Sequence, residues 1–256
     1  MKTNSLLFFS FFLIIGSTAP EQPSAGLLEC HCSPYEPLSE IPEHRRLALV
    51  GNQEQVQEYL TEWEANGGKP QQIQELILAN GALITPELSR FSEVKKLRFQ
   101  SQFDLPLGDL TRFPNLEMLV LENSIMSEGE KIDQVLGLKH LELIKSQLKG
   151  EASAQGVRSL RTLRIHFGSW GKGFLPLGFG KCLEEISING MTAGKIGLNT
   201  VDFSQLSCLK RVYINDTFGS ITGFPKNWDA HRMSFCRFVN MKWTQAQQEI
   251  YKRYRK

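Results

Sequence analysis

The chain has 256 residues, of which 41% are apolar and 22% are charged. This composition supports one large or two small folded domains and argues against wholesale disorder. The formal net charge is only +2, which argues against a general nucleic-acid binder, because such proteins usually carry far more positive charge.

Residues 1–19 have the layout of a secretory signal peptide. Lys2 provides a positive start, an apolar run from Leu6 to Ile15 is broken only by Ser10, and small residues follow. The run is shorter than the about 20 residues that span a membrane, although an uncleaved anchor is an alternative. No later stretch is apolar enough to cross a membrane. We therefore expect a secreted, extracellular or periplasmic protein with no integral span after signal removal.

Residues 20–42 are rich in Pro, Ser and Glu, which predicts an extended lead-in. This segment contains Cys30-His31-Cys32, a pattern that could hold a metal ion. Without a second ligand cluster this is weak evidence for a metal. A disulfide to a later cysteine is the simpler interpretation in an exported protein, and we predict neither a metal nor a cofactor.

Residues 43–69 predict a helical N-terminal cap in two pieces, broken near Gly51. In the second piece, four apolar residues recur with the spacing of one helical face: Val56, Tyr59, Leu60 and Trp63. Asn66-Gly67-Gly68 then predicts the helix end. The apolar face of this cap needs a partner, and the segment that follows is the nearest candidate.

From residue 70 to residue 242, one apolar pattern recurs. Its copies open with Ile73-Leu76-Leu78, Val94-Leu97-Phe99, Leu116-Leu119-Leu121, Leu138-Leu141-Leu143, Leu160-Leu163-Ile165, Leu183-Ile186-Ile188, Leu209-Val212-Ile214 and a degenerate Met233-Cys236-Phe238. First positions are separated by 21, 22, 22, 22, 23, 26 and 24 residues. A nearly fixed period in this range predicts a solenoid of seven or eight stacked units.

The Leu-x-x-Leu-x-Leu copies resemble those of leucine-rich repeat proteins. The resemblance implies an α/β solenoid whose parallel strands form a curved sheet on the concave face. Return segments would bring their own apolar anchors: Leu88 and Phe91, Leu110 and Phe113, Val135 and Leu136. The family usually places Asn or Cys three residues after the last apolar position, yet this chain has Gly81, Gln102, Ser124 and Ser146 there. We therefore expect the family's asparagine ladder to be absent, or shifted by one residue to positions such as Asn80 and Asn123.

The residues between the repeat leucines would face outward on the concave side and line up as columns across neighbouring strands. The side chains that we predict to contact a ligand are Lys96, Arg98, Met118, Val120, Glu122, His140, Glu142, Arg164, His166, Arg211, Tyr213 and Arg237. This mixture of charged, aromatic and apolar residues is typical of a protein-contact surface. An ordinary solvated sheet face is the alternative.

Cys182 and Cys208 each precede the first apolar residue of adjacent repeats, so they share a column. That placement suits either a disulfide or two small core residues. Asn215-Asp216-Thr217 fits a glycosylation acceptor if the protein passes through a eukaryotic secretory route.

Two long inter-strand segments, 168–181 and 189–208, interrupt the regular repeat length. The first carries glycines and aromatic residues and is either a ligand-contacting loop or a longer return segment. Residues 243–256 predict a basic C-terminal helix or tail.

No sequence motif of a metalloprotease or a serine hydrolase occurs. The histidines also lack an obvious acidic or nucleophilic partner in register. We therefore predict a non-catalytic module that recognises a protein or peptide through the concave face. A structural protein of the cell envelope or extracellular matrix, without a dedicated ligand, is the alternative.

Overall fold

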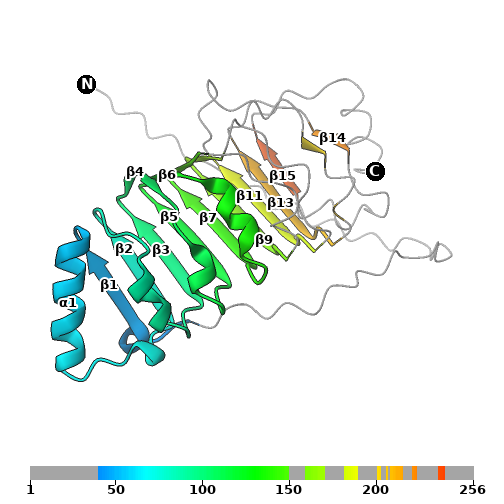
Figure 1. The fold of residues 1–256 in the computed structure, drawn as a ribbon. Coiled ribbons are helices and arrows are strands. Elements are labelled where there is room, and N and C mark those ends of the chain that lie inside the picture. The colour runs from blue at the N-terminus through cyan, green and yellow to red at the C-terminus, as the bar shows by residue number, and fades with distance from the viewer. Residues whose placement is uncertain are drawn as a thin grey trace, which may run out of the picture.

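The computed structural model describes residues 40–149, 159–170, 182–189, 201–202, 206, 208–215, 221–223 and 236–239. Within them, nine short parallel strands lie side by side in one sheet (Figure 1). In spatial order the strands are β1 (Arg46–Val50), β2 (Glu75–Ala79), β3 (Lys96–Gln100), β5 (Met118–Glu122), β7 (His140–Ile144), β9 (Thr162–His166), β11 (Glu185–Asn189), β13 (Arg211–Asn215) and β15 (Cys236–Val239). Strand order follows chain order, as in a solenoid.

The repeat register predicted from the sequence is confirmed. In the five copies from Ile73 to Ile165, the second and third apolar residues lie in a strand and point into one continuous core, as Leu119 and Leu121 do in β5. Ile186 and Val212 belong to the same core. The first apolar residue, such as Leu116, lies two residues before the strand and is also buried. The fold is therefore a leucine-rich repeat solenoid, because each unit buries its apolar face only against its neighbours.

Several predictions lie wholly or mainly outside the described residues. These are the signal peptide (1–19), the lead-in apart from its last three residues, the Cys30-His31-Cys32 motif, most of the two long segments and the basic tail.

The N-terminal part of the fold differs from the prediction. The first helical piece is wrong: residues 43–45 form a short 3-10 turn, η1 (Glu43–Arg45), and the next five form β1. Leu47 and Leu49 are buried, while Arg46, Ala48 and Val50 are exposed. This alternation has the period of two that fits a half-buried strand, and β1 adds one strand ahead of the first predicted repeat.

The second helical piece is confirmed as α1 (Gln53–Ala65). Its N-terminus carries a capping box: Asn52 Oδ1 accepts from the Gln55 backbone N–H at 3.0 Å, and Gln55 Oε1 accepts from the Asn52 N–H at 2.9 Å. Val56 and Leu60 are buried in the core, but Tyr59 is exposed, contrary to prediction. The helix connects β1 to β2 and supplies the return segment of the first unit.

A 3-10 turn, η2 (Pro70–Gln72), follows α1 in the same connection. The next three return segments contain 3-10 turns instead: η3 (Pro86–Arg90), η4 (Leu110–Arg112) and η5 (Gly129–Gln134). α1 lies beside η3, since the Trp63 ring stacks against that of Phe91 with centroids 6.1 Å apart. The predicted anchors are buried apart from Leu136, and Ile132 is buried in η5. The prediction that Leu136 is a core anchor is wrong, because Leu136 follows the buried Val135 and is exposed to solvent.

The structure has a second, smaller parallel sheet that the sequence pattern did not predict, and each of its strands comes after a main strand in the chain. Its strands are β4 (Phe103–Pro106), β6 (Ile125–Ser127), β8 (Gln147–Leu148) and β10 (Ser169–Trp170). A further pair consists of β12 (Val201–Asp202) and β14 (Ile221–Gly223).

A polar ladder joins neighbouring units at the turn between the two sheets. The buried Gln102 amide accepts from the Gly81 N–H at 2.8 Å and donates to the Ala82 carbonyl at 3.0 Å. Ser124 Oγ accepts from the Gln102 N–H, and Ser146 Oγ accepts from the Ser124 N–H, each at 3.1 Å. The asparagine ladder is thus absent from these units, as predicted, and Gln102, Ser124 and Ser146 bond the backbone at the ladder position in its place.

The residue that directly follows a main strand, one position before the ladder, bends the chain out of the sheet. This residue has a positive φ angle in six units: Gly51, Asn80, Ser101, Asn123, Lys145 and Phe167. Asn tolerates this region well, which explains why Asn80 and Asn123 stand one residue before the ladder.

Candidate functional site

The concave face consists of the first, third and fifth residues of the main strands, which point away from the core. Eleven of the twelve predicted contact residues occupy such positions, and Arg237 is placed by its backbone register alone. The register places Lys96 beside Met118 and His140, and Arg98 beside Val120 and Glu142. Arg237 lies beside Tyr213 in the backbone register of β15. The columns derived from the repeat are therefore confirmed.

Two of the twelve residues do not offer contact area. Val120 and His140 are buried, although both lie on the concave face. Val120 is flanked in the same column by Arg98 and Glu142. The contact of these two residues with a ligand stays a prediction that their burial does not favour.

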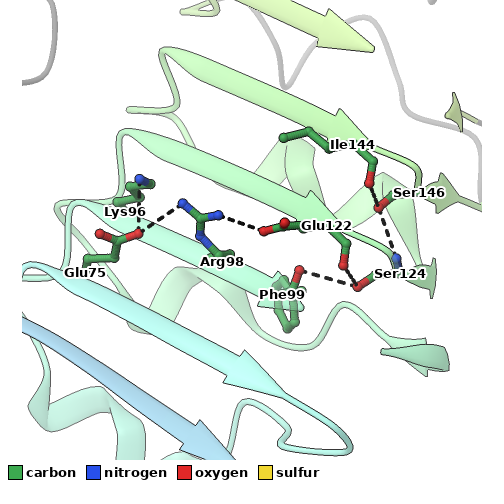
Figure 2. A network of polar contacts seen from close by, with 8 residues as sticks. All are labelled: Glu75, Lys96, Arg98, Phe99, Glu122, Ser124, Ile144 and Ser146. Atoms are coloured by element: carbon green, nitrogen blue, oxygen red, sulfur yellow. Dashed lines mark hydrogen bonds and ion pairs between the residues drawn. The ribbon is translucent and has the colours of Figure 1, made fainter. Parts of the chain in front are cut away.

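An ion-pair network covers the N-terminal half of the face (Figure 2). Its centre is the buried carboxylate of Glu75 on β2. Lys96 Nζ lies 3.0 Å from this carboxylate, Arg46 Nε 3.2 Å and Arg98 Nη2 3.5 Å. Arg98 Nη1 also reaches Glu122 at 2.8 Å. We call these five residues the Glu75 network.

A second chain of ion pairs crosses the C-terminal half. Arg164 on β9 donates to Glu142 on β7 through Nη1 at 2.9 Å, and to Glu185 on β11 through Nε at 3.0 Å. Arg211 on β13 contacts the other oxygen of Glu185 at 2.6 Å through Nη2. We call Glu142, Arg164, Glu185 and Arg211 the Arg164 ladder, because positive and negative charges alternate from strand to strand.

Three participants in these networks were missing from the predicted site. Glu75 and Glu185 lie in the predicted columns, but nothing in the local sequence shows that each binds several cations. Arg46 was missed because its strand was assigned to a helix. The local sequence carries no clear strand signal, because Leu47-Ala48-Leu49-Val50 is apolar throughout and the alternation of burial appears only in the structure.

The two predicted histidines have different surroundings. Burial, followed by the positive charge of Arg164, lowers the pKa of His140 to about 4, so this side chain is neutral at physiological pH. His166 Nε2 lies 3.0 Å from Ser187 Oγ. In the described part of the chain no carboxylate is hydrogen-bonded to His166, so this pair lacks the orienting acid of a catalytic triad.

Beside the Arg164 ladder, the face is hollowed between β11 and β13. The hollow has a volume of about 200 Å³ and is lined by Glu185, Ile186, Ser187, Arg211, Val212 and Tyr213. It combines an aromatic ring, a hydroxyl group and an exposed guanidinium group. A hollow of this kind suits one side chain of a partner.

Cys182 and Cys208 stand three residues before the paired Glu185 and Arg211, and both are disulfide-bonded. A bridge between the two agrees with this register and stays a prediction. Asn215 ends β13, and its glycosylation is likewise untested. Among the described residues, no group of three or more His, Cys, Asp or Glu side chains could hold a metal.

Neither a protein-family model nor a curated protein matches this sequence. Solved structures with a similar fold include an internalin (inlF) from Listeria monocytogenes str. 4b F2365. It is 17% identical with a TM-score of 0.41, and the match covers 68% of this chain and 57% of that one. TLR13 in complex with ssRNA13 is 13% identical with a TM-score of 0.42, and the match covers 78% and 33%.

The leucine-rich repeat domain of APL1B is 11% identical with a TM-score of 0.35, over 77% of this chain and 90% of that one. At these identities the likeness concerns the fold alone. Our expectation of no nucleic-acid ligand stays a prediction that rests on the low net charge. None of the helices in the described segments is long and apolar enough to cross a membrane.

Proposed function

We propose that this leucine-rich repeat solenoid is an exported, non-catalytic module that recognises a protein or peptide through its concave sheet face. The observation that carries the proposal is the pair of ion-pair networks on that face. They hold charged side chains in fixed positions before any partner arrives, which lowers the entropy cost of binding.

The C-terminal half of the face is the better candidate for contact. There Arg164 and Arg211 are exposed, and the hollow beside Tyr213 can receive a side chain. In the N-terminal half the cations surround the buried Glu75, and their first role is to compensate its charge. Contact energy in protein interfaces concentrates in Arg and Tyr residues near the centre, which favours the Arg211 and Tyr213 region.

The scaffold alternative has one observation in its favour. Lys96, Arg98, Glu122, Glu142, Arg164 and Arg211 are all paired with one another or with neighbouring carboxylates. A face whose charges are internally satisfied would also serve a solenoid that only needs to stay folded and soluble outside the cell.

A capture experiment distinguishes the two. The immobilised chain is exposed to the native extracellular fraction beside two variants: Arg211→Glu with Tyr213→Ala on the concave face, and Lys149→Glu as a control. Lys149 is exposed on the small-sheet side, where it pairs with Asp104. We expect a stoichiometric partner that the wild type and the control retain and the concave variant loses at least tenfold.

Circular dichroism confirms that both variants fold. A partner that both variants retain equally would contradict the concave site. The lack of any stoichiometric partner would favour the scaffold role. Reversing Arg98 would be a poor test, because it would place a third carboxylate next to Glu75 and Glu122 and disturb the fold.

A further inference from the structure

In the ion pairs of the C-terminal half, the acidic side chains are more buried than the basic ones. The carboxylate side chains of Glu142 and Glu185 are only 16% and 14% exposed, whereas those of Arg164 and Arg211 are 45% and 65% exposed. The formal charges of the ladder cancel. Its outer surface nevertheless consists mainly of guanidinium groups, with the negative charge beneath them.

The residue before β13 repeats the arrangement. Lys210 is exposed and lies 2.6 Å from the well-shielded carboxylate of Glu184, which Arg161 also contacts at 2.7 Å. Burial opposes ionisation of Glu184, but the hydrogen bonds from Lys210 and Arg161 outweigh it and lower its pKa. The carboxylate is therefore ionised and holds Lys210 next to Arg211, with the ammonium group open to solvent.

The exposed guanidinium groups keep donors for a further acceptor. Arg164 uses Nε and Nη1 for its carboxylates, and Arg211 uses Nη2. Among the described residues, Nη2 of Arg164 and both Nε and Nη1 of Arg211 make no further ion pair. Guanidinium donors bind carboxylates in a planar, often bidentate geometry, and their positions here are already held by the glutamates beneath.

The two arginines also have a useful separation. They contact different oxygens of the same Glu185 carboxylate, at 3.0 and 2.6 Å, so one carboxylate group separates them. Alternate side chains of an extended peptide are about 7 Å apart and lie on the same side of its backbone. Two acidic residues at positions i and i+2 of such a peptide could each meet one guanidinium group.

We propose that the partner presents an acidic, carboxylate-rich extended segment, which lies across β9, β11 and β13 and binds Arg164 and Arg211. This inference rests on the proposed function and specifies the chemistry of its ligand. A nucleic acid is the less favoured polyanion, since a phosphate backbone needs a longer run of cations than these two arginines.

The test uses the full chain and defined probes in a fluorescence-anisotropy titration. The probes are fluorescein-labelled octaglutamate, a neutral Gly-Ser octapeptide and a single-stranded octanucleotide. The variants are Arg211→Gln, which leaves Glu185 paired with Arg164, and the control Lys149→Gln, which removes the same charge from the small-sheet side. Both variants lose one positive charge, so a general effect of net charge would weaken them equally.

We expect octaglutamate to bind the wild type, Arg211→Gln to weaken this binding about fivefold, and Lys149→Gln to change it less than twofold. The neutral peptide should not bind. Equal weakening by both variants, or tighter binding of the octanucleotide than of octaglutamate, would overturn the inference. Absent octaglutamate binding would overturn it too, whereas the proposed function fails only if the capture experiment also finds no concave-face partner.

Discussion

The buried carboxylate of Glu75 provides the sharpest test of how the concave face is held together. Its side chain is only 3% exposed and lies within 3.5 Å of Lys96, Arg46 and Arg98. Glu75→Gln keeps the shape and removes the charge, so three cations lose the anion that compensates them. Removing one partner of a buried ion pair costs about 3–5 kcal/mol.

The three cations retain part of their hydration, because their side chains are 19–37% exposed. We therefore expect a smaller loss of about 2–3 kcal/mol in the free energy of unfolding. For a domain of this size 1 kcal/mol corresponds to about 2–4 °C, so the Tm of Glu75→Gln should fall by about 5–10 °C. Thermal unfolding followed by far-UV circular dichroism measures it.

Glu122→Gln is the matched control. Glu122 belongs to the same network, but it is more exposed, and among the described residues its carboxylate pairs with Arg98 alone. We expect a loss below about 1 kcal/mol, which 0.5 M salt should screen, whereas the Glu75→Gln loss should persist in salt. Equal losses for the two variants, or a Glu75→Gln loss that salt abolishes, would refute the reasoning that burial makes Glu75 the centre of the network.

Three further predictions concern the core, the turns and pH. Leu119→Asp should lower the free energy of unfolding by more than about 4 kcal/mol and unfold the adjacent repeats, because it buries an unpaired charge. The control Leu136→Asp, at an 83% exposed site, should change this free energy by less than about 0.5 kcal/mol, as measured by urea denaturation. Phe167→Asn should raise the Tm by about 2–4 °C, because the exposed Phe167 has a left-handed backbone with φ of 55° that Asn adopts more readily; an unchanged or lower Tm would contradict this. Because burial lowers the folded-state pKa of His140 to about 4 from the ordinary 6.5, the unfolded chain binds more protons between these values, so stability should fall as the pH drops from 6.5 to 4, by up to about 3 kcal/mol. Urea titrations at several pH values across this range should show that the free energy of unfolding falls less steeply with pH in His140→Gln than in the wild type. An equal fall in both proteins would contradict the lowered pKa of His140.

The repeat leucines were sufficient to predict the main sheet. A period of about 22 residues and a buried pair at positions such as Leu119 and Leu121 are local signals, and burial of one strand face imposes them directly. The columns of the concave face then follow, because parallel strands in register align equivalent residues. The same reasoning failed for β1, where Leu47-Ala48-Leu49-Val50 is apolar throughout and its alternation is visible only once the exposed face is known.

The polar ladder shows a different limit. The family pattern led us to look for Asn or Cys at the ladder position, yet Gln102, Ser124 and Ser146 make the same backbone hydrogen bonds. What the turn requires is a buried acceptor that reaches the neighbouring N–H, and side chains of several lengths satisfy it.

The sequence alone determined which residues point into the core and which point out, because that choice depends on alternation along one strand. Only the tertiary structure decided what the outward residues do. Arg98 meets Glu122 across 24 positions of sequence, and Arg164 bridges two glutamates that lie 22 and 21 positions away. The charge partner of a side chain, and how deeply that side chain is buried, depend on the strands on either side of it. These neighbours are set only when the repeats stack, and stacking leaves the guanidinium groups exposed above the more buried carboxylates.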